Sequence, residues 1–488
     1  MRDLLRYQRH AAPRSTALID ARSDERWTYA ELDERVDRTA GRLRSLGLEA
    51  GDQLGALLDG SPAFVRLLHA AWRIGALFVP LNTRLSKPEL RAQTDRVDLD
   101  AFVHDDEPSE TELGSVPVRS VEGSGSLAEE QDVESSPTDR SLDDPRTMLF
   151  TSGTTGEPKA VVLTARNLLA SAVASAFRMG VLPDDRWYDP LPPYHMGGLA
   201  PIVRSALYGT CVVLGGEFDA ERALDDLRSH EATGVSLVPT MLARLLDAGD
   251  LPDSLRFVLT GGAPTPRELI ERCEGRGVPI HPTYGMTETA SQVATARPEE
   301  AFSRPERVGR PLAFTRVRAV DDGEPLATGE PGELVVSGPT VSSGYYGNPE
   351  ATHAAFGSEG YRTGDVGVVE ADGSLRVIGR VDDVVITGGE NVHPAEVATV
   401  LRSHPAVEDA AVVGLPDPKW GERVCALVVA DGVTEGELRS FCEGRLADYK
   451  RPKTIAFADA LPRTASGTVD REAVRELLRD RSRSERLE

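Results

Sequence analysis

Strand-like apolar runs alternate with helix-like amphipathic segments, and this alternation limits the fold of the 488-residue chain more than any other sequence feature. The run at 54–58 precedes a helix-like segment that Ser61 caps, with Pro62 in its first turn, and ALFVPL then returns to a strand. Strands and helices in this order predict a layered α/β domain with parallel strands.

The same order resumes after residue 160. Further strand-like runs are AVVL (160–163), TCVVL (210–214), VSLVP (235–239) and RFVLTGG (256–262). Helices are predicted over 31–46, after the cap Thr164, and from about 219. The acidic segment 105–146 is rich in Ser, Pro and Gly, and we interpret it as a divergent surface region rather than a domain.

The chain is too long for one hydrophobic core, so at least two domains are expected. Near residue 379 the pattern changes to shorter strands and helices, and the change begins with GRVDDVVITGG. We predict a large N-terminal domain over 1–381 and a small C-terminal α+β domain over 382–488, joined by a polar hinge near Asp382.

The charge balance excludes several classes of partner. Asp and Glu number 78 against 55 Lys and Arg, which gives a net charge of −23, and five of the basic residues are lysines. Such a field repels nucleic acid and anionic membranes, so neither is expected to bind. It also repels anionic substrates unless salt screens it, to within about 3 Å at 1 M. We therefore predict a halophilic protein; a codon bias towards arginine is the alternative, although it leaves the acidic excess unexplained.

The sequence also indicates a compartment. Its apolar runs are shorter than a membrane span, and its first residues lack the apolar core of a secretory signal. Cys211, Cys273, Cys425 and Cys442 are scattered without a CxxC pair, so neither a zinc site nor a disulfide framework is indicated. We expect a cytoplasmic protein without a membrane span.

Residues 151–159, TSGTTGEPK, combine four small hydroxyl residues, two glycines and a lysine, which suggests a backbone wrapped around an anion. The spacing differs from the nucleotide-binding P-loop, because Lys159 comes three residues after the second glycine and a strand-like run follows. A solvated turn is the alternative interpretation of this run.

Four further motifs follow in order: LPPYHMGG (191–198), TYGMTET (283–289), YRTGD (361–365) and GRVDDVVITGGENVHPAE (379–396). With TSGTTGEPK they resemble the core motifs of the adenylate-forming superfamily, which contains acyl- and aryl-CoA synthetases, luciferases and peptide-synthetase adenylation domains. The resemblance extends from WTYAEL (27–32) to PRTASGTVDR (462–471). It implies that a small carboxylic acid attacks the α-phosphorus of ATP, that pyrophosphate leaves, and that the acyl-adenylate then reacts with CoA.

The resemblance also implies an ATP site. The residues it assigns to that site are Thr151, Ser152, Gly153, Thr154, Thr155, Gly156, Gly262, Ala263, Pro264, Tyr284, Gly285, Met286, Thr287, Asp365 and Arg380. The loop would hold the β- and γ-phosphates with its N–H groups and hydroxyls, and Lys159 would add a point charge.

Individual roles carry over by position. Tyr284 matches the ring that stacks on adenine, and Thr287 matches the α-phosphate contact. Glu288 matches the carboxylate that binds Mg²⁺, a cation that prefers oxygen ligands. Asp365 matches the residue that binds the ribose hydroxyls, with help from Arg380. Taken alone, Tyr284 also fits an ordinary core residue, and Asp365 also fits a turn former.

Finer matches concern the acid. YGMTETASQVAT (284–295), GLAPIVRSALYGTCVVL (198–214) and GGAPTPRELIERC (261–273) look most like the o-succinylbenzoate–CoA ligases of menaquinone synthesis. That acid needs an apolar slot and one group that holds its second carboxylate. Arg204, on the helix predicted after HMGG, suits this carboxylate, although a surface arginine is the alternative. His195 resembles a substrate-gating histidine, and Ser291 and Gln292 are assigned hydrogen bonds near the ring.

The C-terminal domain resembles the swivelling lid of these enzymes, with Asp382 at its hinge. One face would complete adenylation. After rotation, the loop of Gly388, Gly389, Glu390 and Asn391 would line a tunnel for the CoA thiol. Such a lid separates two half-reactions and excludes water from the acyl-adenylate.

One position departs from the pattern. The family's C-terminal motif ends in a lysine that bridges the attacking carboxylate and the α-phosphate, whereas this chain has Thr468 there. Loss of such a charge could cost several kcal/mol in the barrier. Either Arg463 or Arg471 substitutes, or adenylation is slower, or the first half-reaction is lost. We favour a working ligase with altered lid chemistry.

Other readings stay open at this point. The chain could be a CoA ligase for another aryl or fatty acid, an enzyme that loads a separate carrier protein, or a nucleotide-binding protein without catalysis. The sequence leaves the oligomeric state open.

Overall fold

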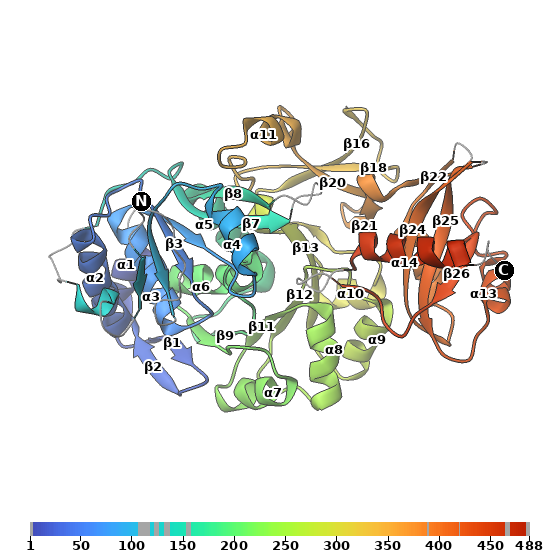
Figure 1. Cartoon of the computed structure of the whole chain (residues 1–488). Coiled ribbons are helices and arrows are strands. Elements are labelled where there is room, and N and C mark those ends of the chain that lie inside the picture. The colour runs from blue at the N-terminus through green and yellow to red at the C-terminus, as the bar shows by residue number, and fades with distance from the viewer. Residues whose placement is uncertain are drawn as a thin grey trace. The chain divides into compact units, whose positions relative to one another are not determined.

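A computed structural model of the chain describes residues 3–105, 118–121, 126–130, 137–152, 158–387, 390–418, 420–463 and 469–484 (Figure 1). It separates into two compact units. The first consists of Met1–Val317, Val336–Tyr361 and Gly373–Leu375, and the second of Arg318–Val335, Arg362–Asp372 and Arg376–Glu488. The predicted domain boundary next to Asp382 stays a prediction.

A nine-stranded sheet forms the centre of the first unit. Its order is β15 (Arg310–Pro311), β14 (Ser291–Thr295), β13 (Ile280–Met286), β12 (Phe257–Thr260), β11 (Gly234–Leu237), β9 (Arg186–Asp189), β10 (Cys211–Leu214), β1 (Thr16–Asp20) and β2 (Glu25–Thr28). The strands from β13 to β1 pair in parallel, and β14, β15 and β2 add antiparallel edges. This confirms the predicted parallel α/β layer.

A six-stranded sheet forms a second layer. Its order is β6 (Val118–Ser120), β5 (Leu99–His104), β3 (Gln53–Leu57), β4 (Leu77–Pro80), β7 (Pro145–Ser152) and β8 (Pro158–Thr164). The strands are parallel except for β8, which runs antiparallel to β7. The motif TSGTTGEPK extends from the end of β7 to the start of β8, and its residues 153–157 lie outside the described residues.

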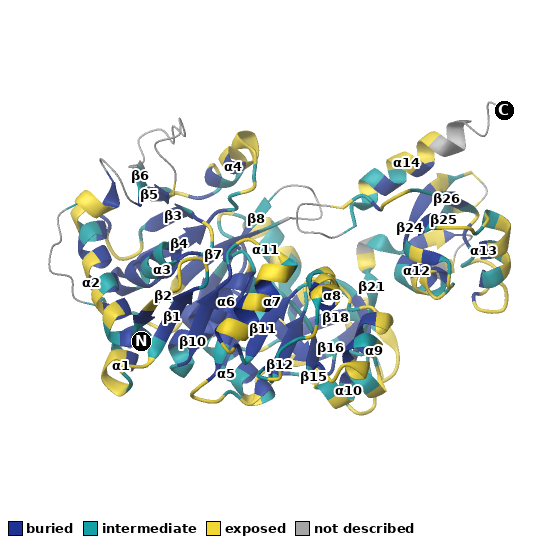
Figure 2. Cartoon of the chain, turned by 90° about the horizontal axis from the view of Figure 1, so that it is seen from below, coloured by how far each residue is buried: buried dark blue, intermediate teal, exposed yellow. Residues whose placement is uncertain are grey.

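Helices cover both sheets. They are α1 (Leu4–Ala11), α2 (Tyr29–Ser45), α3 (Pro62–Ile74), α4 (Lys87–Thr94), α5 (Ala165–Met179), α6 (Met196–Tyr208), α7 (Ala220–Ser229), α8 (Pro239–Ala248), α9 (Arg267–Gly275), α10 (Pro298–Ser303) and α11 (Pro349–Ala355). Because strand side chains alternate between faces, Val212 packs with α2, α3 and α6, whereas Val213 packs with α7, α8 and α9. The first group of helices therefore lies between the two sheets, whose strands Figure 2 shows as largely buried.

Local capping explains where several helices begin. Ser61 accepts a hydrogen bond from the Phe64 N–H and precedes Pro62, as predicted. Thr164 forms a capping box with Asn167 at the start of α5. Helix α2 begins two residues earlier than predicted, because Thr28 forms a capping box with Glu31.

Two further sheets follow. One has the order β17 (Glu324–Pro325), β16 (Arg316–Asp321), β18 (Pro331–Ser337), β20 (Gly360–Val369) and β19 (Phe356–Gly357), with β21 (Leu375–Arg380) also paired to β20. The other has the order β23 (Glu390–Val392), β22 (Val385–Thr387), β25 (Gly421–Ala430) and β24 (Val407–Asp417), with β26 (Thr454–Phe457) parallel to β25.

Helices α12 (Pro394–Arg402) and α13 (Glu435–Cys442) cover one face of the last sheet, and α14 (Arg471–Ser484) covers the other. This arrangement is the predicted small α+β domain. None of the helices among the described residues combines the length and apolar character needed to cross a membrane.

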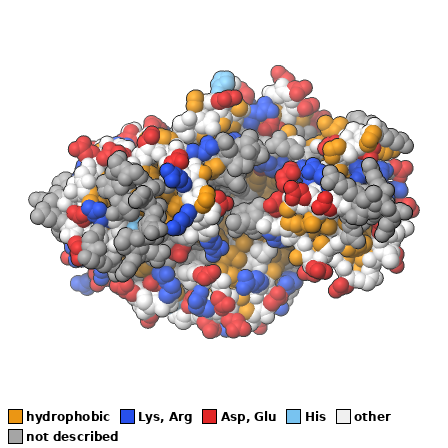
Figure 3. All heavy atoms as spheres, in the orientation of Figure 1, with side chains coloured by type: hydrophobic (Ala, Val, Ile, Leu, Met, Phe, Trp, Pro, Cys, Tyr) orange, Lys and Arg blue, Asp and Glu red, His pale blue; other side chains and the backbone are white. Residues whose placement is uncertain are grey.

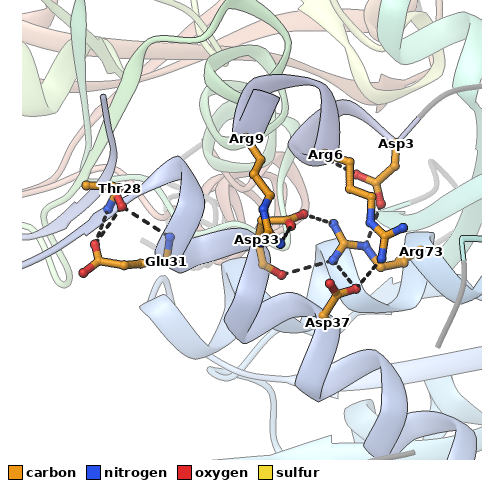
Figure 4. Close-up of polar contacts among 8 residues, drawn as sticks. All are labelled: Asp3, Arg6, Arg9, Thr28, Glu31, Asp33, Asp37 and Arg73. Carbon is orange, nitrogen blue, oxygen red and sulfur yellow. Dashed lines mark hydrogen bonds and ion pairs between the residues drawn. The ribbon is translucent and has the colours of Figure 1, made fainter. Parts of the chain in front are cut away.

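Helix α1 is held by a group of charged residues that we call the Arg73 cluster (Figure 4). Its members are Asp3, Arg6, Arg9, Asp33, Asp37 and Arg73. The cluster joins α1 to α2 and α3, and the Arg73 side chain is fully buried within it.

Candidate active site

The two ends of the motif TSGTTGEPK lie on neighbouring antiparallel strands. Thr151 at the end of β7 pairs with Lys159 at the start of β8. The predicted loop residues Gly153, Thr154, Thr155 and Gly156 lie outside the described residues, and of Ser152 the structure describes the backbone. The pairing of β7 with β8 therefore brings Lys159 beside Thr151.

Glu288, assigned to Mg²⁺, is a buried acidic residue of the first unit. It lies in a short 3₁₀ helix, Thr287–Thr289, directly after β13, and is 8% exposed. Its Oε1 accepts a hydrogen bond from the Tyr345 hydroxyl at 3.0 Å, and the Lys159 Nζ lies 5.1 Å from the centroid of the same tyrosine ring. Burial raises the pKa of Glu288, although hydrogen bonds from Tyr345 and Tyr361 and the charge of Lys159 oppose the rise.

The surroundings of Glu288 fit a metal site in which the protein supplies only some of the ligands. Mg²⁺ commonly takes one or two protein carboxylates and completes its shell with phosphate oxygens and water. Among the described residues, no group of three or more His, Cys, Asp or Glu side chains could hold a metal ion by itself. A single carboxylate such as Glu288 is consistent with the predicted role of holding Mg²⁺ together with the phosphates of a nucleotide.

The assigned adenine contacts lie at the carboxyl ends of two neighbouring parallel strands. Strand β12 leads into Gly262, Ala263 and Pro264, and the adjacent strand β13 carries Tyr284. Ligands bind at this edge of open α/β sheets. Gly285 is required here, since a Cβ at that position would lie 1.8 Å from the Ser291 carbonyl oxygen on β14. Met286 ends β13, and Thr287 follows it.

The motif LPPYHMGG forms a tight turn into helix α6. The His195 N–H bonds to the Pro192 carbonyl at 3.1 Å, and a Cβ on Gly198 would lie 2.4 Å from the Leu191 carbonyl oxygen. His195 is exposed at the N-cap of α6, with its ring 4.8 Å from the Tyr194 ring. An exposed histidine at the start of α6 is consistent with the predicted role of His195 in gating the substrate.

Arg204 lies in the interior, not at the surface. It is 2% exposed, and its Nη2 donates to the Ser171 hydroxyl at 3.3 Å. Within the described part of the chain no carboxylate forms an ion pair with it, and burial lowers the pKa of the guanidinium. The alternative of a surface arginine is therefore wrong, because α6 lies between two sheets and is buried on most sides.

The start of β14 comes close to this arginine. Ser171 also donates to the Ala290 carbonyl at 2.5 Å, which links α5 and α6 to the segment that contains Ser291 and Gln292. Gln292 is 1% exposed, and its Nε2 donates to Thr295 at 2.8 Å. Its Oε1 has no hydrogen-bond partner among the described residues. Ala290 and Ser291 both have positive φ, 54° and 100°, a strained conformation that is common at ligand sites.

In the second unit, Asp365 and Arg380 lie together as predicted. Arg380 Nη1 is 3.2 Å from Asp365 Oδ1, across strands β20 and β21. A Cβ on Gly364 would lie 2.9 Å from Arg380 Nη2, so the glycine admits the guanidinium. Asp382 lies in a 3₁₀ turn, Val381–Asp383, of which the structure describes its backbone.

The remaining assigned residues belong to the predicted lid. Gly388, Gly389 and Thr468 lie outside the described residues, whereas Glu390 and Asn391 lie on β23. The two arginines considered as substitutes for the missing lysine both have acidic partners. Arg463 lies 2.7 Å from Asp409, and Arg471 forms an ion pair with Asp383. Each would have to leave its partner to act at the reacting centre.

Sequence reasoning did not select Tyr345 or Ser171. Both contact assigned residues across long separations, 57 residues for Tyr345–Glu288 and 119 for Ser171–Ala290. The run SSGYYGNP around Tyr345, with its turn residues and paired tyrosines, is the signal that could have pointed to the first.

Residues 5–346 match the AMP-binding enzyme family, and residues 396–468 match the AMP-binding enzyme C-terminal domain. The chain belongs to the AMP-binding enzyme family. Among similar members of this family, the 2-succinylbenzoate–CoA ligase of Bacillus licheniformis is 39% identical over 473 residues, covering 96% of this chain and 98% of that protein.

Solved structures of AMP-binding enzymes agree with this fold. The o-succinylbenzoate CoA synthetase of Bacillus subtilis, in complex with the acyl-adenylate intermediate OSB-AMP, superposes with a TM-score of 0.91 at 36% identity, covering 97% of this chain and 98% of that one. The same synthetase in complex with ATP and magnesium ion gives a TM-score of 0.88 at 35% identity, covering 98% and 99%.

Proposed function

We propose that this AMP-binding enzyme is an ATP-dependent 2-succinylbenzoate–CoA ligase of menaquinone biosynthesis. The observation that carries the substrate assignment is Arg204, a buried guanidinium without a carboxylate partner among the described residues. This guanidinium would suit the second carboxylate of a dicarboxylic acid such as 2-succinylbenzoate. The near full-length similarity to ligases for this acid supports the same reading.

In the first half-reaction, the benzoate carboxylate attacks the α-phosphorus of ATP and pyrophosphate leaves. Lys159 and the loop hold the outer phosphates, and Thr287 contacts the α-phosphate. Glu288 would hold Mg²⁺, which would neutralise charge on the phosphates when it is bound. Asp365, oriented by Arg380, binds the ribose hydroxyls, and Tyr284 with the Gly262 loop holds the adenine.

In the second half-reaction, the CoA thiol attacks the acyl carbon and AMP leaves, which yields 2-succinylbenzoyl-CoA. Arg204 and Gln292 hold the acid in both steps, and Ser291 and His195 border it. A lid that turns about Asp382 would present the loop of Gly388, Gly389, Glu390 and Asn391 to CoA.

We propose a cytoplasmic reaction at high salt. All four cysteines are free and buried, which fits a reducing compartment. Figure 3 shows acidic side chains scattered over the visible face among basic ones, so the excess negative charge is not gathered in a single patch there. Molar salt would screen this charge from the anionic ATP, CoA and acid.

The deciding assay uses purified protein in molar KCl with Mg-ATP, CoA and 2-succinylbenzoate, and follows pyrophosphate and the CoA thioester together. Both products are expected. Pyrophosphate without thioester would indicate another acceptor, and activity with other acids alone would overturn the substrate assignment.

A second candidate, nucleotide binding without adenylation, is favoured by the lysine's replacement with Thr468 and by the acidic partners of Arg463 and Arg471. ATP binding without pyrophosphate release from any acid would identify it.

A further inference from the structure

Tyr345 contacts two oppositely charged residues: Lys159, assigned to the phosphates of ATP, and Glu288, assigned to its Mg²⁺. Its hydroxyl donates to Glu288 Oε1 at 3.0 Å, and the Lys159 ammonium lies over its ring at 5.1 Å from the centroid. The side chain is 9% exposed. The phenol donates its proton to the carboxylate, which is a hydrogen-bond acceptor. It presents its electron-rich ring face to the ammonium, which a cation–π interaction favours.

The backbone fixes this placement from both sides. Tyr345 pairs with Val161 on β8, two residues beyond Lys159, and the Tyr346 N–H bonds to the Ala160 carbonyl at 2.8 Å. The Ser342 N–H bonds to the carbonyl of Glu288 itself at 2.8 Å. Because these contacts use main-chain atoms, a change of the Tyr345 side chain leaves the segment in register.

Opposite charges at short range in a poorly solvated site attract strongly. A direct Lys159–Glu288 ion pair would neutralise both groups before the nucleotide arrives. The described residues, however, show no ion pair between Lys159 and Glu288, and each contacts Tyr345 instead. The phenol gives each charged group a contact that is weaker than an ion pair. Each group can therefore exchange this contact for one with Mg-ATP.

We propose that Tyr345 is a positioning residue that keeps Lys159 and Glu288 apart, so that the carboxylate is available to the metal of Mg-ATP and the ammonium to its phosphates. This inference rests on the proposed function of the same site. The hydroxyl orients Glu288, and the ring separates it from Lys159.

The chain supplies a matched control in the adjacent residue. The Tyr346 hydroxyl donates to Asp98 at 2.7 Å and accepts from Gln53 at 2.8 Å, outside the assigned site. Tyr345→Phe and Tyr346→Phe therefore each remove one phenolic hydroxyl from the same segment. ATP binding to wild type and both variants is measured by calorimetry, without the acid, in magnesium and again in EDTA.

We expect Tyr345→Phe to reduce the gain in ATP affinity that magnesium brings by about tenfold, and to leave the affinity in EDTA unchanged, because the ring still separates the charges. Tyr346→Phe should match wild type in both buffers. Tyr345→Leu removes the ring as well, so Lys159 and Glu288 can pair, and ATP affinity in EDTA should also fall by about tenfold.

The outcomes separate the inference from the function. Equal magnesium gains in Tyr345→Phe and Tyr346→Phe would overturn the positioning role, as would an equal loss in both buffers, which indicates a structural role. Failure of wild type to bind ATP in either buffer would instead refute the proposed function and this inference with it.

Discussion

The buried arginines Arg73 and Arg204 differ in their partners. Arg73 donates to Asp3 at 2.7 Å, Asp33 at 2.5 Å and Asp37 at 2.8 Å, and its side chain is fully buried (Figure 4). Arg204 is nearly as buried, at 2% exposure, yet in the described part of the chain its recorded hydrogen bond is to the Ser171 hydroxyl.

We propose that the difference distinguishes a charge that stabilises the fold from a charge that binds a ligand. Removing an ion from water costs several kcal/mol, and the cost is recovered only when partners are close and hydrogen-bonded. In the folded chain, ion pairs with the carboxylates of Asp3, Asp33 and Asp37 offset this cost for Arg73. Among the described residues no carboxylate offsets this cost for Arg204, so a carboxylate of a bound ligand would interact favourably with it. Glu288, with hydroxyl partners instead of a cation, is the acidic counterpart.

The largest expected effect tests the structural side of this comparison. Arg73→Met leaves three carboxylates without their central cation, and should lower the free energy of unfolding by about 3–5 kcal/mol. Urea unfolding measures it. Arg9→Met, which removes a half-exposed member of the same cluster, should cost less than about 1 kcal/mol. Equal losses for the two variants would contradict the central role of Arg73.

Arg204→Met tests the other side. We expect kcat/KM for 2-succinylbenzoate to fall about 100-fold, mostly through KM, because the acid's second carboxylate loses its cation. The free energy of unfolding should stay the same or rise, since the variant removes a buried charge that has no carboxylate partner among the described residues. The control is Arg166→Met, an exposed arginine paired with Asp143, which should change neither value. A large loss of stability without a change in KM would show that Arg204 is structural.

A pH effect is expected next to the Arg73 cluster. Burial lowers the pKa of His69 to about 4, with the Asp3 charge opposing and the Arg73 charge adding to the fall. The unfolded chain then binds more protons below about pH 6.5, so stability should decrease as pH falls from about 6.5 to 4, by about 1–2 kcal/mol at pH 5.

His69→Gln should remove this contribution, which urea unfolding at pH 7 and pH 5 can measure. His281, whose pKa burial also lowers to about 4, provides a second group of the same sign far from the cluster. A His69→Gln variant that keeps the full wild-type loss between pH 7 and pH 5 would refute the assignment.

The smallest effect concerns the missing lysine. Thr468→Lys should raise the adenylation rate about three- to tenfold, because Arg463 and Arg471 are engaged with Asp409 and Asp383. Pyrophosphate release in single turnovers measures it. Thr464→Lys, which adds the same charge four residues earlier, is the control. No gain would mean that another cation already acts during adenylation.

Local chemistry made much of the fold predictable. The caps at Ser61 and Thr164 and the alternating apolar runs act over a few residues, and the corresponding helices and strands lie where they were expected. The start of α2 was misplaced although its Thr28–Glu31 capping box is visible in the sequence. The Asp365–Arg380 pair was also predictable, since the two residues belong to neighbouring motifs.

The sequence by itself therefore determined the parallel α/β layers, the small α+β domain and the ordered motifs that carry the family's chemistry. Tertiary structure alone decided that Arg204 is buried without a carboxylate partner among the described residues and that Tyr345 contacts both Lys159 and Glu288. The physical reason is range: capping and periodicity act within a few residues, whereas burial and the partners of a charge depend on segments that only packing brings together.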